Sequence, residues 1–401
     1  MNPIVWDWVN LTVRWLHLIA GIAWIGSSFY FMALDASLRR RANLPTGVAG
    51  ESWQVHGGGF YNMQKYMVAP AELPDELHWF KYEAYFTWIS GFVLLWIVYY
   101  VGAGIYLIDR SVMDLSPAAA TAIGVGSLAV GWVIYDQLCK SRLGGNEALL
   151  AAVGFVLLVA ATWGYPRVFS GRGAYIHAGA LIGTIMVANV FLVIIPNQKR
   201  VVASLLARER PDPALGKQAK QRSAHNNYLT LPVLFAMISN HYPMTFGHRW
   251  NWLIFAGVIV VGGVVRHFFN AWNAGRGALW WPWPVAGAFM ALLVLITMQG
   301  RDDRGPAVAE AGATAVGFAE VRDVIARRCT VCHASRPSFD GFEAPPAGVV
   351  FETAEQIDRE AARIHAQAIA TDAMPPGNVT EITDDERRLI AAWLASNGAP
   401  R

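Results

Sequence analysis

The chain has 401 residues, of which 54% are hydrophobic and 15% are charged. Soluble domains carry about 25% charged residues, so this composition excludes an ordinary soluble protein. The net charge of +3 gives no reason to expect a nucleic-acid partner. The charge is unevenly placed, since residues 301–401 hold 16 of the 29 acidic residues and no lysine. We expect a membrane domain followed by a small soluble domain.

Eight apolar segments lie in residues 1–300 and are predicted to cross a lipid bilayer. A spanning helix needs about 20 mostly apolar residues, and the sixth segment is the weakest because it is short and contains Pro232. The predicted fold is therefore all-α, with a polytopic bundle of about eight transmembrane helices. The predicted spans are 11–34, 82–108, 118–138, 147–165, 175–195, 228–240, 250–270 and 284–299.

The basic residues between these segments predict the orientation of the bundle. Lys and Arg favour the cytoplasmic side of a membrane. Together with the adjoining span ends, which include Arg266 and Arg14, the connections after the odd-numbered spans hold 16 Lys and Arg, against 5 for the even-numbered connections and the N-terminal side of the first span. The odd-numbered connections are therefore predicted to be cytoplasmic. Both the N-terminus and the C-terminal domain then face the outside, which is the periplasm in a bacterium.

Residues 301–313 are predicted to be a linker, because they combine Gly, Pro and charged residues without apolar periodicity. Residues 314–401 are predicted to form a separate helical domain. Within it, residues 351–370 show the period of an amphipathic helix, with Ile357 and Ile364 on the apolar face.

The sequence CTVCH near the start of this domain is its most specific motif. Cys329 and Cys332 flank two residues, and His333 follows at once. This spacing is the attachment sequence of a c-type haem, in which two thioethers hold the porphyrin and the imidazole ligates the iron. A zinc site would need further ligands, and the domain offers only His365. A redox dithiol would need a thioredoxin-like context.

The second axial ligand of this haem iron is predicted to be Met374, in the sequence TDAMPPGN. A methionine opposite a histidine raises the haem potential, which suits an electron acceptor. Thr383 and Glu386 then predict a capping box at the start of a final helix that contains Trp393. The whole domain resembles a class I cytochrome c.

Polar residues within the predicted spans are functional candidates, because polar groups are costly in a bilayer. An outer group comprises His17, His177 and His241, which could hold a second haem, of b type, within the bundle. The row HNNY, residues 225–228, could bind a planar heterocycle that carries N–H and C=O groups through hydrogen bonds. The inner group comprises Glu83, Asn189, His225, Asn226, Asn227, Tyr228, Arg266, His267 and Asn270, and the first cytoplasmic connection adds His56 and Lys65.

Most of these residues also have an ordinary structural interpretation. A histidine at the end of a span is often an interfacial residue, and Arg266 and His267 could reach the cytoplasmic surface and set the orientation. Asn189 could form an interhelical hydrogen bond. The three glycines after His56 permit close approach of a ligand to the backbone, but they are a weak signal.

Several motifs together resemble those of the bacterial membrane-bound urate oxidases. They are RWLHLIAGIAWIGSSFYF, HGGGFY, FKYEAYFTWISGF, IIPNQK and HNNYLTLPVLFAMISNHYP, and the resemblance covers the linker and tail as well. It implies that urate and water give 5-hydroxyisourate, two electrons and two protons. The electrons then pass through the c-type haem to a respiratory acceptor, such as a cytochrome c oxidase or a soluble cytochrome c. No hydrogen peroxide forms, and the location is the bacterial inner membrane.

The resemblance and the polar row together suggest how urate binds. Asn226, Asn227 and Tyr228 would hydrogen-bond its amide edges, and Glu83 or His225 would accept a proton. Lys65 or Arg266 would stabilise the anion. An inner site of this kind is separated from an outer haem by most of the hydrocarbon layer, which is about 30 Å thick. Either urate binds near the outer group, or a second carrier bridges the gap.

Two other functions agree with the same motifs. The bundle could oxidise quinol and pass its electrons through the tail, or it could be a transporter-like bundle that only tethers the cytochrome. Addition of urate without oxygen separates the three functions, because only a urate oxidase reduces its c-type haem in response to urate.

Overall fold

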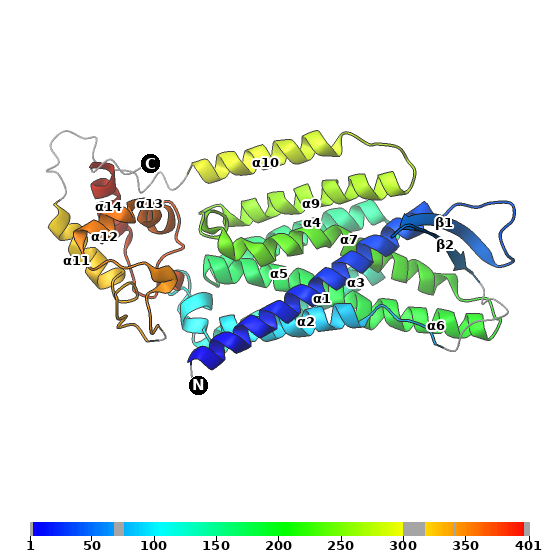
Figure 1. Cartoon of the computed structure of the whole chain (residues 1–401), viewed down its shortest axis with the longest axis horizontal. Coiled ribbons are helices and arrows are strands. Elements are labelled where there is room, and N and C mark those ends of the chain that lie inside the picture. The colour runs from blue at the N-terminus through cyan, green and yellow to red at the C-terminus, as the bar shows by residue number, and fades with distance from the viewer. Residues whose placement is uncertain (1–2, 68–75, 300–316, 341, 397–401) are drawn as a thin grey trace.

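A computed structural model describes residues 3–67, 76–299, 317–340 and 342–396 of the chain. The described residues form a long helical bundle and a small helical domain, the tail, at one end of it (Figure 1). The predicted linker, residues 301–313, lies outside the described residues.

A helix occupies each of the eight ranges predicted to span the membrane. The second range continues beyond α2 as two π-helical turns, η1 and η2, and the fifth continues from α5 through the π-helical η5 into α6. These elements are α1 (Pro3–Ser37), α2 (Tyr82–Leu95), η1 (Trp96–Tyr100), η2 (Ala103–Leu107), α3 (Pro117–Lys140), α4 (Glu147–Gly164), α5 (Gly171–Ala188), η5 (Asn189–Ile194), α6 (Ile195–Leu206), α7 (Pro213–Ile238), α8 (Pro243–Phe246), α9 (Asn251–Asn273) and α10 (Pro282–Met298).

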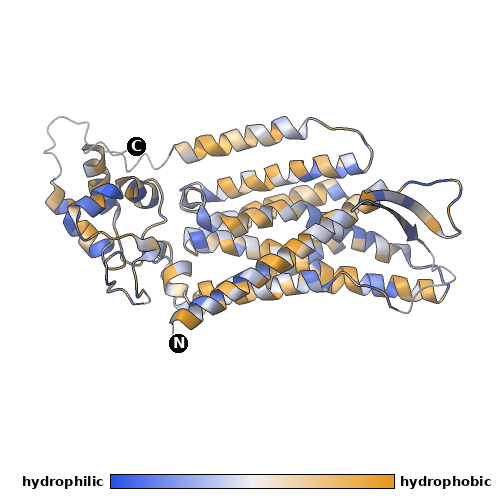
Figure 2. Cartoon of the chain, viewed as in Figure 1, coloured by the Kyte–Doolittle hydropathy of each residue, from blue (hydrophilic) through white to orange (hydrophobic). Residues whose placement is uncertain are grey.

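Five helical stretches among the described residues are long and apolar enough to cross a membrane by themselves. They are Ile4–Ser37, Pro117–Lys140, Glu147–Arg167, Gly171–Leu206 and Asn251–Asn273. Figure 2 shows apolar residues along most of the bundle's length. This is the composition of a membrane protein.

The remaining three predicted spans differ from a simple apolar helix for local reasons. The second is interrupted near Gly102, where a Cβ would come within 2.6 Å of the Val98 carbonyl oxygen. The sixth belongs to α7, which begins at Pro213 and so includes the charged segment predicted as a connection. Lys, Arg, Gln, Ala and Leu are good helix formers, which explains why this segment is helical. The eighth, α10, has 17 residues.

The connections after α1 and α9 lie at the end of the bundle away from the tail (Figure 1). The first of them contains an antiparallel hairpin of β1 (Val48–His56) and β2 (Gly59–Tyr66). The expectation of an all-α chain is therefore wrong for this connection. The glycines of HGGGFY form its turn, because Gly57 and Gly58 have φ values of +56° and +80° that favour glycine.

Helix α5 lies at the centre of the bundle and packs against α2, α3, α4 and α7. Its contact with α7 is close because both helices present small residues there. A Cβ on Gly179 would come within 2.5 Å of the Ala236 Cβ. Small residues allow membrane helices to approach each other in this way, and the approach brings the polar residues of α7 next to those of η5.

The tail consists of short helices around its own apolar core. They are α11 (Phe318–Arg328), α12 (Ala354–Arg359), α13 (Ala361–Ile364), the π-helical η9 (His365–Ile369) and α14 (Asp384–Ser396). Ile357 and Ile364 are buried, which confirms the predicted apolar face. The predicted capping box also forms: the Thr383 N–H donates to Glu386 Oε2 at 2.9 Å, and the Glu386 N–H donates to Thr383 Oγ1 at 3.2 Å.

The tail contacts the bundle through the loop that contains Met374. The Asp372 N–H donates to the Gly247 carbonyl at 3.0 Å. Gly377 packs so closely on the Ile108 carbonyl that a side chain would not fit there. The loop predicted to ligate haem iron therefore lies on the end of the bundle where the chain begins (Figure 1).

Candidate functional site

The HNNY row of α7 faces two different neighbours. Consecutive residues on a helix point about 100° apart. His225 and Asn226 contact α3 and the region around η5, whereas Asn227 and Tyr228 contact α9. The structure therefore divides the predicted single site into two clusters.

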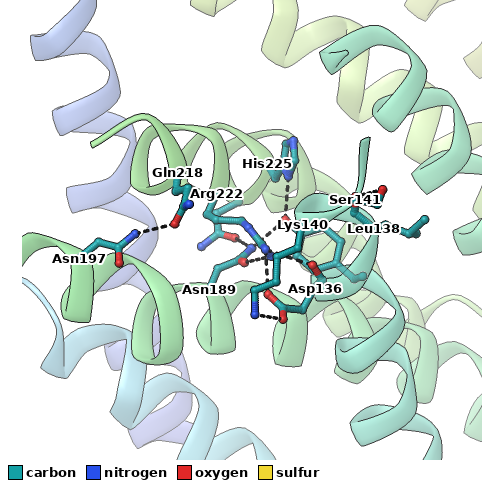
Figure 3. Close-up of polar contacts among 11 residues, drawn as sticks. Asp136, Leu138, Lys140, Ser141, Asn189, Asn197, Gln218, Arg222 and His225 are labelled. Atoms are coloured by element: carbon teal, nitrogen blue, oxygen red, sulfur yellow. Dashed lines mark hydrogen bonds and ion pairs between the residues drawn. The ribbon is translucent and has the colours of Figure 1, made fainter. Parts of the chain in front are cut away.

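The first cluster, which we call the α3–α7 network, is built around a buried ion pair (Figure 3). Arg222 Nη2 donates to Asp136 Oδ1 at 2.8 Å, and Lys140 Nζ lies 2.6 Å from Asp136 Oδ2. Arg222 Nη1 also donates to Asn189 Oδ1 at 3.1 Å. The network thus joins α3 and α7 through groups of opposite charge and joins η5 to α7 through the Asn189 amide.

His225 and Asn226, the first half of the HNNY row, belong to the same network. Asn189 Nδ2 donates to Asn226 Oδ1 at 2.9 Å, and Asn226 Nδ2 donates to the Met186 carbonyl at 2.8 Å. The Tyr135 hydroxyl lies 2.7 Å from His225 Nδ1. A buried polar network whose members are partnered rigidifies a helix bundle. The Asn189 amide forms interhelical hydrogen bonds, as its structural interpretation expected.

The second cluster, which we call the α7–α9 network, contains a buried cation without a carboxylate partner among the described residues. Arg266 Nε donates to Asn227 Oδ1 at 3.2 Å, and Asn270 Nδ2 donates to the same oxygen at 2.9 Å. The Arg266 guanidinium also lies 3.9 Å from the centre of the Phe29 ring. Arg266 is only 7% exposed, so it is not a residue that reaches the surface.

Asn227 is wholly buried, and its Nδ2 has no hydrogen-bond partner among the described residues. Two donors fix the orientation of this amide, because both require its oxygen. The Nδ2 group must therefore point away from them. A buried amide N–H without an acceptor costs free energy, and a ligand with a carbonyl or anionic oxygen would supply the acceptor. Tyr228 and His267 extend the network, with the hydroxyl 3.1 Å from Nδ1.

The other inner candidates are separate from this network in the described structure. Glu83 is half-buried in the first turn of α2, which packs against α1 and α5, and its carboxylate has no partner among the described residues. His56 is exposed next to the hairpin turn, and Lys65 pairs with Asp35 at 2.8 Å.

The three outer histidines do not share one environment. His177 is wholly buried, with Nδ1 donating to the Gly173 carbonyl at 2.8 Å and Nε2 3.1 Å from the Tyr100 hydroxyl. Both ring nitrogens are therefore engaged. His241 is exposed. His17 Nδ1 donates to the Thr87 carbonyl at 2.9 Å, while its Nε2 forms no hydrogen bond with described residues.

His17 lines a cavity of about 350 Å³ between α1, α2, α5 and α7, which we call the bundle cavity. Its walls are mostly apolar and aromatic, with Trp24 and Trp88 among them. Arg172 and Asn240 lie in its wall and also line a second cavity, of about 460 Å³, between the bundle and the Met374 loop. We call this second space the junction cavity.

The tail contains the four residues that were predicted to hold a haem. Cys329 and Cys332 form no disulfide. His333 Nδ1 donates to the Val349 carbonyl at 3.0 Å, which leaves Nε2 for a metal. Met374 is held by its backbone, since its N–H donates to the Gln367 carbonyl at 2.9 Å and its carbonyl accepts from Arg387 Nη1 at 2.9 Å.

Neither the ion pair of the α3–α7 network nor the two residues shared by the cavities was predicted from the sequence. Asp136 gave a usable signal, because it is an acidic residue in an otherwise apolar helix. Arg172 and Asn240 gave none, since each lies at the end of a predicted span, where polar residues are common. Their role depends on a tail that is distant in sequence.

Comparison with known families identifies the bundle. A family model described as urate oxidase N-terminal matches residues 3–298. The chain belongs to the urate oxidase N-terminal family. The match covers the bundle from α1 to α10 and confirms the resemblance to urate oxidases there, while the tail lies outside it. No curated protein and no solved structure matches the chain.

Proposed function

We propose that this chain is an eight-span urate oxidase of the bacterial inner membrane that passes electrons to a c-type haem in its own tail. Urate and water give 5-hydroxyisourate, two electrons and two protons. The observation that carries the proposal is the position of the Met374 loop, which lies on one end of a bundle belonging to the urate oxidase N-terminal family. The urate site that releases electrons and the haem that accepts them would thus lie in one chain.

The residues of the tail fit a covalent haem c. Cys329 and Cys332 would form the thioethers, and His333 and Met374 would ligate the iron. When bound, the haem accepts electrons one at a time. The Val349 carbonyl orients the His333 ring, and Arg387 holds the Met374 loop in place.

The α7–α9 network is the better candidate for the urate site. It combines a buried guanidinium without a carboxylate partner and an amide N–H that requires an acceptor. Urate is an anion with several carbonyl oxygens, so Arg266 would neutralise it and Asn227 Nδ2 would donate to it. In the α3–α7 network the buried Arg222 pairs directly with Asp136, and the second cation, Lys140, pairs with the same carboxylate and is largely exposed. No buried cation there needs a ligand as its partner.

Proton transfer in this site would use groups that already contact each other. The Tyr228 hydroxyl lies 3.1 Å from His267 Nδ1, and these two residues directly follow Asn227 and Arg266 in the chain. His267 would accept a proton from the bound substrate through Tyr228. Glu83 and His225, the bases expected first, would act only if the substrate also reached α2 or α3.

Reduction of the tail by urate tests the proposal directly. The whole chain, purified in detergent and oxidised, is mixed with urate without oxygen, and the absorption of the c-type haem is followed. We expect reduction together with formation of 5-hydroxyisourate. Quinol-dependent reduction without a response to urate would favour the quinol-oxidising alternative. Reduction by neither compound would favour the tethering bundle.

Substitutions in the α7–α9 network test the assigned site. Asn227→Ala and Arg266→Gln each remove one charge-assisted contact, so urate-driven reduction should slow about 10- to 100-fold while chemical reduction of the haem stays normal. Asn197→Ala is a matched control, because among the described residues the Asn197 side chain on α6 donates to the Leu215 carbonyl and to Gln218 Oε1, outside the α7–α9 network. Wild-type rates in both network variants would contradict the assignment.

A further inference from the structure

The bundle cavity takes no part in the proposed urate site, yet it has the features of a cofactor pocket. Its volume of about 350 Å³ lies in the range of ligand sites. It extends along α1 from His17 to Ile25, which is eight residues or about 12 Å at 1.5 Å per residue. That length is comparable with the width of a porphyrin ring, and the tryptophans in its walls suit a flat aromatic guest.

His17 has the arrangement of a metal-ligating histidine. Its Nδ1 is held by the Thr87 carbonyl at 2.9 Å and lies 3.2 Å from Ser90 Oγ. A ligating histidine commonly donates its other ring N–H to a backbone carbonyl in this way. The ring also lies against Gly91, where a Cβ would come within 2.8 Å of His17 Cε1. The imidazole is therefore fixed, with Nε2 as its free acceptor.

Two cations line the same cavity. Arg14 lies three residues before His17, so both project from one face of α1. Its Nε donates to Asn10 Oδ1 at 2.6 Å. Arg172 Nε donates to Asn240 Oδ1 at 3.3 Å. Neither arginine has a carboxylate partner among the described residues. An apolar cavity with two such cations would attract a ligand with an apolar body and acidic groups at one edge.

We propose that the bundle cavity binds a b-type haem. His17 Nε2 ligates the iron, the aromatic and aliphatic walls enclose the ring, and Arg14 and Arg172 pair with the two propionates. Met186 and Met237 also line the cavity and carry thioethers of the kind that serve as a sixth ligand. The site uses one of the three outer histidines, because His177 is engaged at both nitrogens and His241 is exposed outside the cavity lining.

The role of this haem rests on the proposed function. Urate oxidation releases two electrons, and a single haem accepts one. A b-type haem and a c-type haem together accept both, so two ferric ions become ferrous for each urate oxidised. The position also suits a relay. Val233 lines the cavity six residues beyond Asn227, about 9 Å along α7, and Arg172 and Asn240 separate the cavity from the junction cavity beside Met374.

The haem content of the purified whole chain tests the proposal. Cells are supplied with a haem precursor, and the protein is assayed by the pyridine haemochrome method before and after extraction with acidified acetone. We expect one b-type and one c-type haem per chain, of which only the b-type is extracted. A chain with c-type haem alone would overturn the proposal. Recovery of a stoichiometric quinone from the cavity would overturn it as well.

Substitution of His17 locates the site. In His17→Ala the b-type haem content per chain should fall at least about tenfold, while the c-type haem content stays the same. Added imidazole should restore the b-type absorption. Size-exclusion chromatography shows whether the variant is folded. His241→Ala is the matched control and should keep both haems. Full b-type content in His17→Ala would assign the haem elsewhere and contradict the proposal.

The arginines and the urate reaction give independent checks. Arg14→Gln should release the b-type haem faster to an acceptor protein than the wild type does, because one propionate loses its cation. An unchanged release rate would contradict the pairing. Failure of the haem proposal leaves urate-driven reduction of the c-type haem intact, whereas failure of the urate proposal leaves the haem stoichiometry intact.

Discussion

Two buried arginines differ in the partners that surround them. Arg222 contacts a carboxylate and an amide, whereas Arg266 contacts two amides and an aromatic ring. An arginine stays charged in a protein, so neighbouring groups must compensate the positive charge of its buried guanidinium. Asp136 supplies it for Arg222. For Arg266 we assign that role to the bound substrate.

Loss of the cation in the α3–α7 network should affect stability. Arg222→Gln leaves Asp136 buried with Lys140 as its remaining cation. We expect a loss of about 3 kcal/mol in the free energy of unfolding. The thermal midpoint of the detergent-solubilised chain measures it. Arg222→Gln combined with Asp136→Asn should recover most of the loss, and an equally unstable double variant would show that the charge pair is not the cause.

The sequence predicted the polar residues of the inner site but not their grouping. Four adjacent polar residues on a span are visible in the sequence alone. Which neighbours they contact depends on the packing of α7 between η5 and α9, and no local pattern contains that information. Asp136 and Arg222 were separated by 86 residues, so their pairing could not be read from spacing.

At the scale of elements, one glycine allows the tail to reach the bundle. Gly247 follows α8, and its carbonyl accepts the Asp372 N–H. A Cβ at this position would lie 2.9 Å from the Pro243 carbonyl oxygen and 3.0 Å from Thr371 Cβ. Any larger residue must therefore move the Met374 loop away from the bundle.

Gly247→Ala should slow the delivery of electrons to the tail. We expect urate-driven reduction of the c-type haem to fall by about tenfold, because a small displacement of a reacting pair has effects of this order or larger. Stopped-flow absorption measures the rate. Gly145→Ala is the control, since nothing lies within 4 Å of a Cβ there. A wild-type rate in Gly247→Ala would mean that this contact does not set the transfer.

The capping box of α14 gives the tail a pH-dependent stability. Burial alone would raise the pKa of the Glu386 carboxyl, but the Thr383 N–H and the Arg328 guanidinium outweigh it and lower the pKa below the ordinary value of 4.5. A carboxyl with a lowered folded pKa stabilises the folded state above its unfolded pKa. That contribution disappears as the pH falls through the folded pKa.

Glu386→Gln should therefore destabilise the tail at neutral pH by about 1 kcal/mol. The difference from the wild type should shrink below about pH 4 as the wild-type carboxyl becomes protonated. The urea concentration at which protease removes a C-terminal tag from the whole chain measures this stability. Asp358→Asn is a suitable control, because Asp358 is an exposed acidic residue on α12, outside the box. A constant difference at all pH values would contradict the argument.

Elements with strong local signals were predicted correctly, and those shaped by connections were not. The apolar face of residues 351–370 and the capping box of α14 agree with the structure. The single helix predicted for 351–370 is instead divided at Glu360 into α12, α13 and η9. The hairpin of β1 and β2 was missed because its strands were interpreted as a loop around three glycines. The π-helical turns after α2 were missed because π turns have no simple sequence signature.

At the scale of the whole molecule, the bundle has two chemically different ends. The hairpin and the connection from α9 to α10 lie at one end, and the tail lies at the other (Figure 1). The basic residues of the connections predict that the hairpin end is cytoplasmic. The c-type haem motif predicts that the tail end is periplasmic, and the two predictions agree.

Accessibility of single cysteines tests this orientation. Phe60→Cys places a thiol on exposed β2, and Asp114→Cys places one in the connection before α3. We expect a membrane-impermeant maleimide to label Asp114→Cys in intact spheroplasts, and Phe60→Cys only after permeabilisation. The unsubstituted chain reports labelling of its native thiols. The opposite pattern would invert the topology and place the haem motif in the cytoplasm.

The tail contacts the bundle, so under the proposed function the first transfer of electrons occurs within one polypeptide. Its rate is then independent of how densely the enzyme populates the membrane and is weakly affected by ionic strength, unlike a collision between two freely diffusing partners. Only the departure of electrons from the tail remains a bimolecular event. Dilution or added salt should therefore slow turnover at the transfer of electrons from the tail to a diffusing acceptor. That acceptor must bind a face of the tail that the bundle does not cover.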